Sequence, residues 1–144
     1  SNLMSGRIEG SDGAHALARL DTATTLRLPR DGAQDGAQVQ LGVRPEKIRL
    51  VDGAAPVPDL NFLSGRVRDA SYTGVSTQYL VDLSTGSTMT VYEQNTARSG
   101  AHTIHRPGDM VGLAWSPTDT FVVRPEQADS PGSEQQEVSD ARPT

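Results

Sequence analysis

The residue types that carry phosphate chemistry are sparse in this chain. Its single lysine, Lys47, lies in the segment Pro45–Ile48, and neither a G-x-x-x-x-G-K-[ST] nor a G-x-G-x-x-G pattern occurs. A phosphate-binding loop needs a Gly-rich backbone together with a lysine that reaches the terminal phosphates. The sequence therefore predicts that this chain does not hydrolyse a nucleotide by the usual route.

Residues for metal binding or nucleophilic catalysis are equally scattered. His102 and His105 lie in a Gly- and Pro-flanked segment that favours a loop, and neither a cysteine nor a third ligand accompanies them. His15 is isolated, with no carboxylate or serine context that suggests a triad, and no G-x-S-x-G elbow is present. No pair of carboxylates suggests a general acid and base. We expect a chain without catalytic residues and without a metal site.

The segment Arg44-Pro45-Glu46 is the most distinctive short motif. It follows an apolar strand pattern that ends at Val43, and the proline stops the strand because it has no N–H and a fixed φ. Arg44 and Glu46 could form an ion pair across the turn or contact another chain. The residues alone favour a strand-end turn with solvated charges, since an exposed pair contributes only about 0–1 kcal/mol.

A second polar group could line a small-molecule pocket. Gln78, Tyr92, Gln94 and Asn95 fall at the edges of two expected strands. Their ordinary interpretation is as rim residues of a sheet, and we keep both interpretations open at this point.

Composition excludes several classes of protein. The 144 residues contain no cysteine, 35% hydrophobic residues and a net charge of −5, which argues against a nucleic-acid partner and excludes disulfides. No apolar run is long enough to cross a membrane, and no signal peptide is apparent. Residues 125–144 contain five acids, one base and no large apolar side chain, so we expect a disordered acidic tail. The rest, residues 1–124, is close to neutral.

The elements that must position these residues are short strands. Thr77–Leu83 and Thr88–Tyr92 alternate apolar and polar residues around a Gly-containing turn, which predicts a β-hairpin. Val111–Trp115 and Val39–Val43 show the same alternation, and Trp115 is expected in the core. Gly10–Leu20 is the one candidate for a short helix. The chain is predicted to be all-β, a small barrel or sandwich.

Two segments are repeated in the chain. Residues 2–8 (NLMSGRI) match residues 61–67 (NFLSGRV), and residues 39–45 (VQLGVRP) match residues 111–117 (VGLAWSP). A repeated supersecondary unit buries its apolar face by pairing with its copy. We therefore expect two related halves of short antiparallel strands, about residues 1–52 and 60–124.

These motifs together resemble the C-terminal regulatory region of ABC-importer ATPases. The resemblance is carried by Gly42-Val-Arg44-Pro45-Glu46, by the segments 72–79 and 91–95, and by the G-D-x-V-x-L-x-W-x-P pattern of residues 108–117. It implies an OB-like transport-associated (TOBE-type) domain of the maltose, glycerol-phosphate and spermidine/putrescine type. The sequences of residues 72–79 and 91–95 are most similar to those of the polyamine branch.

The resemblance also implies a setting. In that family, the full ATP-binding subunit is a cytoplasmic homodimer that works with permease subunits at the inner face of the bacterial membrane. The domain is a non-catalytic scaffold and regulator, and ATP and Mg²⁺ bind the nucleotide-binding domain, which lies outside this chain. Gly42, Arg44, Pro45 and Glu46 become candidate interface residues. No cofactor, nucleic acid or membrane insertion is expected for the domain itself.

Two other hypotheses stay open. A stand-alone OB-like protein could bind an oxyanion or a polyamine, and polyamine binding would need Asp69, Asp82 and Glu93 to converge. Oligonucleotide binding suits the fold class but not the composition, because the near-neutral core has few aromatic residues and no basic run.

Overall fold

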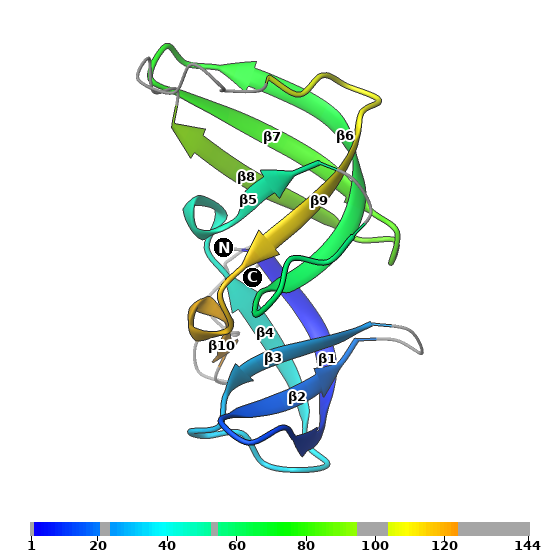
Figure 1. Cartoon of the computed structure of the whole chain (residues 1–144), viewed down its shortest axis with the longest axis vertical. Helices are drawn as coiled ribbons and strands as arrows, with labels where there is room; N and C mark the ends of the chain where they lie inside the picture. The colour runs from blue at the N-terminus through cyan, green and yellow to red at the C-terminus, as the bar shows by residue number, and fades with distance from the viewer. Residues whose placement is uncertain (1, 21–23, 53–54, 95–103, 124–144) are drawn as a thin grey trace, which may run out of the picture.

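The computed structural model describes residues 2–20, 24–52, 55–94 and 104–123, and they form strands joined by turns (Figure 1). The strands are β1 (Asn2–Ser11), β2 (His15–Arg19), β3 (Thr25–Pro29), β4 (Gln38–Val43), β5 (Arg49–Val51), β6 (Asn61–Tyr72), β7 (Ser76–Leu83), β8 (Thr88–Gln94), β9 (Met110–Trp115) and β10 (Phe121–Val123). Two 3-10 turns, η1 (Pro45–Lys47) and η2 (Pro117–Asp119), precede β5 and β10. In these ranges there is no helix that could cross a membrane. The all-β fold class expected from the sequence is confirmed.

The strands form two five-stranded antiparallel sheets, which lie one above the other along the long axis of the molecule (Figure 1). The first sheet has the order β10-β4-β1-β2-β3, and the second has the order β5-β9-β6-β7-β8. Each sheet therefore contains four consecutive strands of one half of the sequence and the last strand of the other half. This exchange of β5 and β10 does not follow from the repeat alone.

The two exchanged strands pair in the same register. Phe121 of β10 lies opposite Gly42 of β4, and Arg49 of β5 lies opposite Ala114 of β9. The offset of 72 positions that relates Gly42 to Ala114 also relates Arg49 to Phe121. The sequence repeat therefore corresponds to a repeat of hydrogen-bonded partners.

Proline-led turns start both exchanges. Pro45 and Pro117 each occupy the beginning of a 3-10 turn, where a missing N–H costs nothing. The Lys47 N–H donates to the Arg44 carbonyl at 3.0 Å, and the Asp119 N–H donates to the Ser116 carbonyl at 2.9 Å. The chain thus leaves one sheet and enters the other within a few residues.

The expected hairpin is present as β7 and β8. The Leu83 N–H donates to the Ser87 carbonyl at 2.7 Å, and Gly86 has a φ of 99°, which favours glycine. The candidate helix over 10–20 was a wrong prediction, because this range contains the turn after β1 and strand β2. Ala16 and Ala18 alternate into the core there, and period-two burial decided against a helix.

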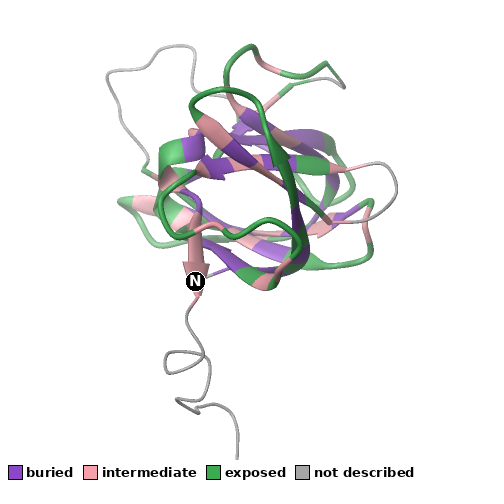
Figure 2. Ribbon diagram, turned by 90° about the horizontal axis from the view of Figure 1, so that it is seen from below, coloured by how far each residue is buried: buried purple, intermediate pink, exposed green. Residues whose placement is uncertain are grey.

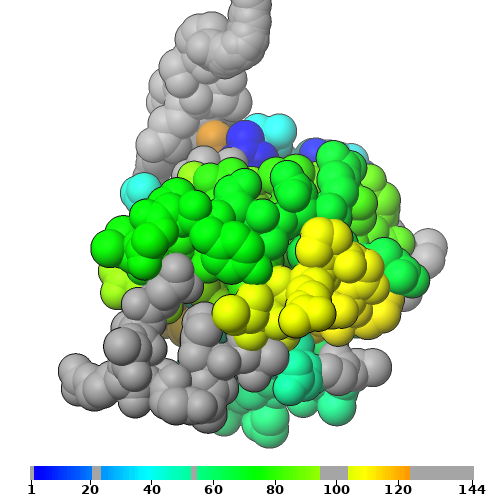
Figure 3. Space-filling view, turned by 90° about the horizontal axis from the view of Figure 1, so that it is seen from above, coloured from blue at the N-terminus to red at the C-terminus, as the bar shows by residue number. Residues whose placement is uncertain are grey.

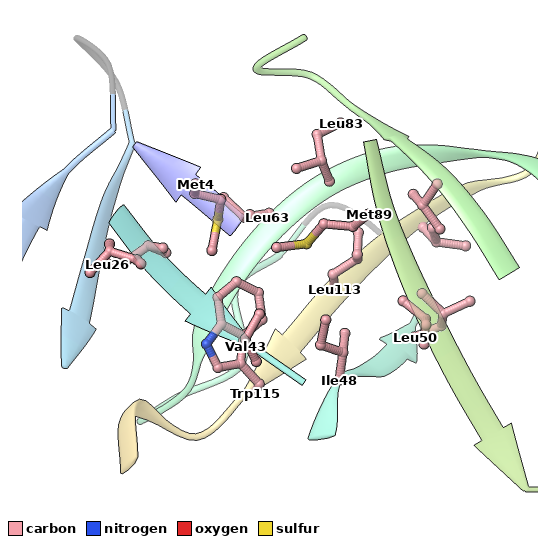
Figure 4. Packing of buried hydrophobic residues seen from close by; sticks show 14 of the residues in the cluster. Met4, Leu26, Val43, Ile48, Leu50, Leu63, Leu83, Met89, Leu113 and Trp115 are labelled. Carbon is pink, nitrogen blue, oxygen red and sulfur yellow. The ribbon is translucent and has the colours of Figure 1, made fainter. Parts of the chain in front are cut away.

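Figure 2 marks the buried residues along the strands, and their side chains from both sheets pack into one core (Figure 4). Trp115 is 1% exposed, as expected for a core anchor, and its indole N–H donates to the Thr120 hydroxyl at 2.8 Å. Around it in Figure 4 lie Met4, Leu26 and Val43 from the first sheet and Leu63, Leu113 and Met89 from the second. Neither sheet could bury its apolar face without the other.

A buried asparagine at the start of each half joins the two sheets. Asn2 of β1 donates to the Thr90 carbonyl and accepts from the Thr90 N–H, both at 2.8 Å. Asn61 of β6 bonds the N–H and carbonyl of Arg27 in the same way, at 2.8 and 2.9 Å. Each amide thus acts as a short piece of backbone for the edge strand of the opposite sheet, and neither strand edge is left unsatisfied there.

Candidate functional site

Gly42, the first residue of the distinctive motif, makes room for the exchanged strand. The ring of Phe121 lies against its Cα, so closely that a Cβ at position 42 would overlap ring atoms. The guanidinium carbon of Arg44 lies 5.9 Å from the centroid of the same ring. A cation over an aromatic face is attracted by its quadrupole, by roughly 0.5–1 kcal/mol at an exposed site. Gly42 and Arg44 therefore fit β10 against β4.

The other two motif residues shape the turn. Pro45 opens η1 and is half-buried, whereas Glu46 is exposed. Within the described ranges, no ion pair joins Arg44 to Glu46. Of the alternatives that the sequence left open, the ion pair between Arg44 and Glu46 is therefore not formed, and the Arg44 guanidinium lies over the Phe121 ring. A role of this motif in contacts with another chain stays a prediction.

The structure places the second polar group on an outer face. Gln78 of β7 lies opposite Tyr92 of β8, and Ser76 lies opposite Gln94, with Gln78, Tyr92 and Gln94 all exposed. Asn95 lies outside the described residues. Three of the four predicted residues are thus neighbours on one surface, and ligand binding by them stays a prediction.

The three carboxylates that polyamine binding would need point to different partners. Asp82 accepts two hydrogen bonds from Arg68, at 2.7 and 3.1 Å, and these bonds lower the pKa of Asp82 and raise that of Arg68. Asp69 accepts from the Ala70 N–H at 2.9 Å. Glu93 turns to the other side of its sheet and bonds β5. This set does not form one cation site.

Glu93 closes the gap between the two edges of the second sheet. The edge strands β5 and β8 are not paired with each other, and the Glu93 carboxylate accepts from the Leu50 N–H at 3.1 Å across this seam. Strand β8 also packs on η1. The free edge of β5 is thereby capped by a side chain.

The matching seam of the first sheet is open. Its edge strands β3 and β10 flank a half-open groove of about 810 Å³, with β4 and η2 at its sides. Leu28, Val39 and Val122 supply apolar lining, and Asp31 is the one ionisable side chain among the lining residues. This volume lies in the range of roughly 300–1,000 Å³ that small ligand sites occupy.

Two residues explain why this seam stays open. The strand registers make Leu28 of β3 in the first sheet equivalent to Val91 of β8 in the second sheet. Pro29 is therefore equivalent to Tyr92, and Arg30 is equivalent to Glu93. Strand β3 ends at Pro29, and the Arg30 guanidinium donates to the Gly13 carbonyl at 2.8 Å, away from β10. An arginine could not accept an N–H in any case. The groove was not predicted from the sequence, because the residues that are equivalent at the two seams differ in residue type. Their equivalence appears only in the strand registers.

The histidines do not form a metal centre in the described part of the chain, where no group of three candidate ligands occurs. His105 is 6% exposed and packs edge-on to the Tyr79 ring, with 5.9 Å between centroids. Burial raises the pKa of Tyr79. His102 lies outside the described residues. The segment before β9 runs beside β6 and β7 (Figure 3): Gly108 and Asp109 bond the Val67 backbone of β6, and His105 packs against Tyr79 of β7.

Fold and site together define a domain of two antiparallel sheets of the OB-like type, with two proline-led exchange turns and one open seam. A known family has this domain. The chain belongs to the TOBE domain family, whose model matches residues 41–123, from β4 to β10.

Curated relatives extend the similarity over most of the chain. The spermidine/putrescine import ATP-binding protein of Thermobifida fusca is 39% identical over 127 residues, covering 85% of this chain and 31% of the relative. The protein of the same name from Acidothermus cellulolyticus is 36% identical over 118 residues, covering 81% and 30%. That from Frankia alni is 33% identical over 133 residues, covering 85% and 28%. The chain therefore spans less than a third of the length of these relatives.

A solved structure shares the fold. The cytoplasmic molybdate-binding protein ModG, in a molybdate-bound crystal form, superimposes with a TM-score of 0.71 over 86% of this chain and 96% of that one. The sequence identity is 16%, so this likeness establishes the fold alone.

Proposed function

We propose that this chain is the regulatory domain of the ATP-binding subunit of a bacterial ABC importer for polyamines such as spermidine and putrescine. The observation that carries the proposal is the similarity of at least 81% of the chain to three proteins with that name, at 33–39% identity. Membership of the TOBE family supports it independently.

The domain acts as a non-catalytic scaffold. ATP and Mg²⁺ bind a separate nucleotide-binding domain of the parent subunit, and this domain binds neither. Its two sheets share one core and are joined by two buried asparagines, which suits a rigid module that keeps its shape while neighbouring domains move. Rigid packing of this kind transmits displacement instead of absorbing it.

The parent subunit works as a homodimer at the cytoplasmic face of the membrane, in contact with permease subunits through its nucleotide-binding domain. The turn that follows the buried Gly42 is one candidate contact surface of the regulatory domain; Arg44, Pro45 and Glu46 form it, and Arg44 and Glu46 are exposed there. The polar rim of Gln78, Tyr92, Gln94 and Asn95 is the second.

Uptake by cells tests this function. We would delete residues 2–123 from the subunit that the gene encodes and measure uptake of labelled spermidine and putrescine, with maltose and glycerol phosphate as control solutes. We expect loss or deregulation of polyamine uptake only. ATP hydrolysis by the purified 144-residue chain, or unchanged polyamine uptake together with loss of a control solute, would contradict the proposal.

A further inference from the structure

The two seams of this molecule are related by register but differ in how they are closed. In the second sheet, the Leu50 N–H points away from β9 and is capped by Glu93. Leu50 lies opposite Leu113, and Val122 lies opposite Leu41, at positions that the repeat makes equivalent. The Val122 N–H therefore points away from β4 as well, toward the groove.

This orientation follows from antiparallel pairing. Successive residues of an edge strand direct their N–H and carbonyl alternately to the paired strand and to the free side. At Val122, both groups face the free side, and β3 does not pair with β10. Unpaired backbone groups beside apolar side chains form a template for another extended chain.

The lining of the groove indicates what kind of chain fits. Val39 and Val122 are half-buried and can receive apolar side chains, whereas the Leu28 side chain is buried in the core; the Gln38 and Gln40 side chains are exposed and can bond polar groups. The one ionisable lining residue, Asp31, is acidic and exposed, so it favours a basic residue in the occupant. Residues 125–144 fit poorly, since they contain five acids, one base and no large apolar side chain.

A second copy of the folded domain fits poorly too. Its own β10 has only three residues, and η2 packs on β3 beside the groove. The groove volume of about 810 Å³ suits a few residues of extended chain and not the edge of a whole sheet.

We propose that the groove between β3 and β10 binds an extended segment of a partner polypeptide by strand addition, with apolar residues in the groove and a basic residue beside Asp31. The Val122 N–H donates to a carbonyl of the partner, and the Val122 carbonyl accepts from its N–H. Such strand addition takes affinity from backbone hydrogen bonds and specificity from alternate side chains. The inference concerns a site separate from the candidate residues named above and does not depend on the transported solute.

The test titrates the full chain with blocked model peptides and follows backbone amides by NMR. The probe is acetyl-Thr-Val-Lys-Val-Thr-Val-amide. One control peptide has Glu in place of Lys, and a second carries N-methyl groups on alternate backbone nitrogens. We expect saturable shifts at Val122 and Leu28, binding about twofold to fivefold weaker for the Glu peptide, and none for the N-methylated one.

Matched variants of the chain separate strand addition from unspecific adhesion. Val122→Pro removes the outward N–H without removing a bond to β4, and proline is tolerated at such an edge. Arg30→Glu places a carboxylate where Glu93 stands in the other seam, so it should cap Val122 and weaken peptide binding about fivefold. If Val122→Pro does not fold, the peptide affinity of the Arg30→Glu variant decides between strand addition and unspecific adhesion.

Four results would overturn the inference. In the titration, these are equal binding of the N-methylated peptide and the lack of a shift at Val122. In hydrogen exchange of the chain without peptide, they are protection of the Val122 amide only at high protein concentration, and protection that disappears when the chain is cut after Val123. The third would assign the groove to a second copy, and the fourth to residues beyond β10.

Discussion

Gly42 on β4 lies directly under the ring of Phe121 on β10, so a side chain at this position has no room. We predict that Gly42→Ala destabilises the domain by about 1–3 kcal/mol, because the methyl group pushes the ring of the exchanged strand outward. Urea unfolding followed by Trp115 fluorescence measures the change.

A double-mutant cycle isolates this contact. In a Phe121→Ala background, the added methyl group no longer meets a ring, so most of the cost of Gly42→Ala should disappear. An equal cost in both backgrounds would show that the alanine acts on β4 itself and not through Phe121.

Tyr79 is the residue whose ionisation bears most directly on stability. It is fully buried beside His105, and burial raises the pKa of its phenol, with the nearby Glu93 adding to the effect. The folded state therefore holds the proton more tightly than the unfolded chain, whose tyrosines titrate near pH 10. The contribution of Tyr79 to the free energy of unfolding is therefore fully present below about pH 10 and decreases as the pH rises above that value.

We predict that Tyr79→Phe reduces this alkaline loss of stability while changing stability at neutral pH much less. Urea midpoints measured in steps from neutral to strongly alkaline pH give the two slopes. Tyr92→Phe is the matched control, because Tyr92 is exposed. Identical slopes for the wild type and Tyr79→Phe would contradict the assignment.

At the scale of elements, Asn2 and Asn61 join edge strands to the opposite sheet. Removing either amide leaves a backbone N–H and a carbonyl without a partner, at Thr90 or at Arg27. We predict a cost of about 1–3 kcal/mol for Asn2→Ala and for Asn61→Ala. Ser5→Ala, on the exposed side of β1, should cost far less.

Hydrogen exchange distinguishes these two variants. Exchange of the Thr90 amide should accelerate in Asn2→Ala and exchange of the Arg27 amide in Asn61→Ala, each before global unfolding. If both amides accelerate equally in both variants, the asparagines contribute only to overall stability and do not hold particular edges.

The sequence alone predicted most elements but not their exchange between sheets. Alternation of apolar residues located β4, β7, β8 and β9, because one face of each is buried. The repeat beginning at Asn2 and Asn61 predicted two related halves. It could not show that β5 and β10 cross over, because a three-residue strand carries no pattern that identifies its partner.

The candidate site was predictable to a smaller extent. The motif beginning at Gly42 was recognisable in the sequence, but the structural reason for its glycine is the ring of Phe121, 79 positions further along the chain. The open seam depends on the difference between Arg30 and Glu93, two residues whose equivalence appears only in the strand registers. Long-range pairing of this kind is set by tertiary packing and not by local sequence.

At the scale of the whole molecule, each half supplies a strand that the other sheet needs. The core is continuous across both sheets, and Trp115 of the second half bonds Thr120 beside the strand that enters the first sheet. Unfolding one sheet would therefore remove an edge strand from the other. A domain built in this way should unfold in one cooperative transition.

We predict that residues 1–52 and residues 60–124, produced as separate polypeptides, are each unfolded and fold together when mixed. Alone, the first half could pair only with a copy of itself. In such a pair, Arg49 would take the position of Phe121 over Gly42, and Val43 would take the position of Trp115 in the core. The resulting charge and cavity would cost several kcal/mol, of the size that a large-to-small core substitution causes. Circular dichroism and amide exchange at Leu41 and Leu113 would follow the mixing. Folding of either half alone, with its central amides protected, would show that the exchanged strands are not required.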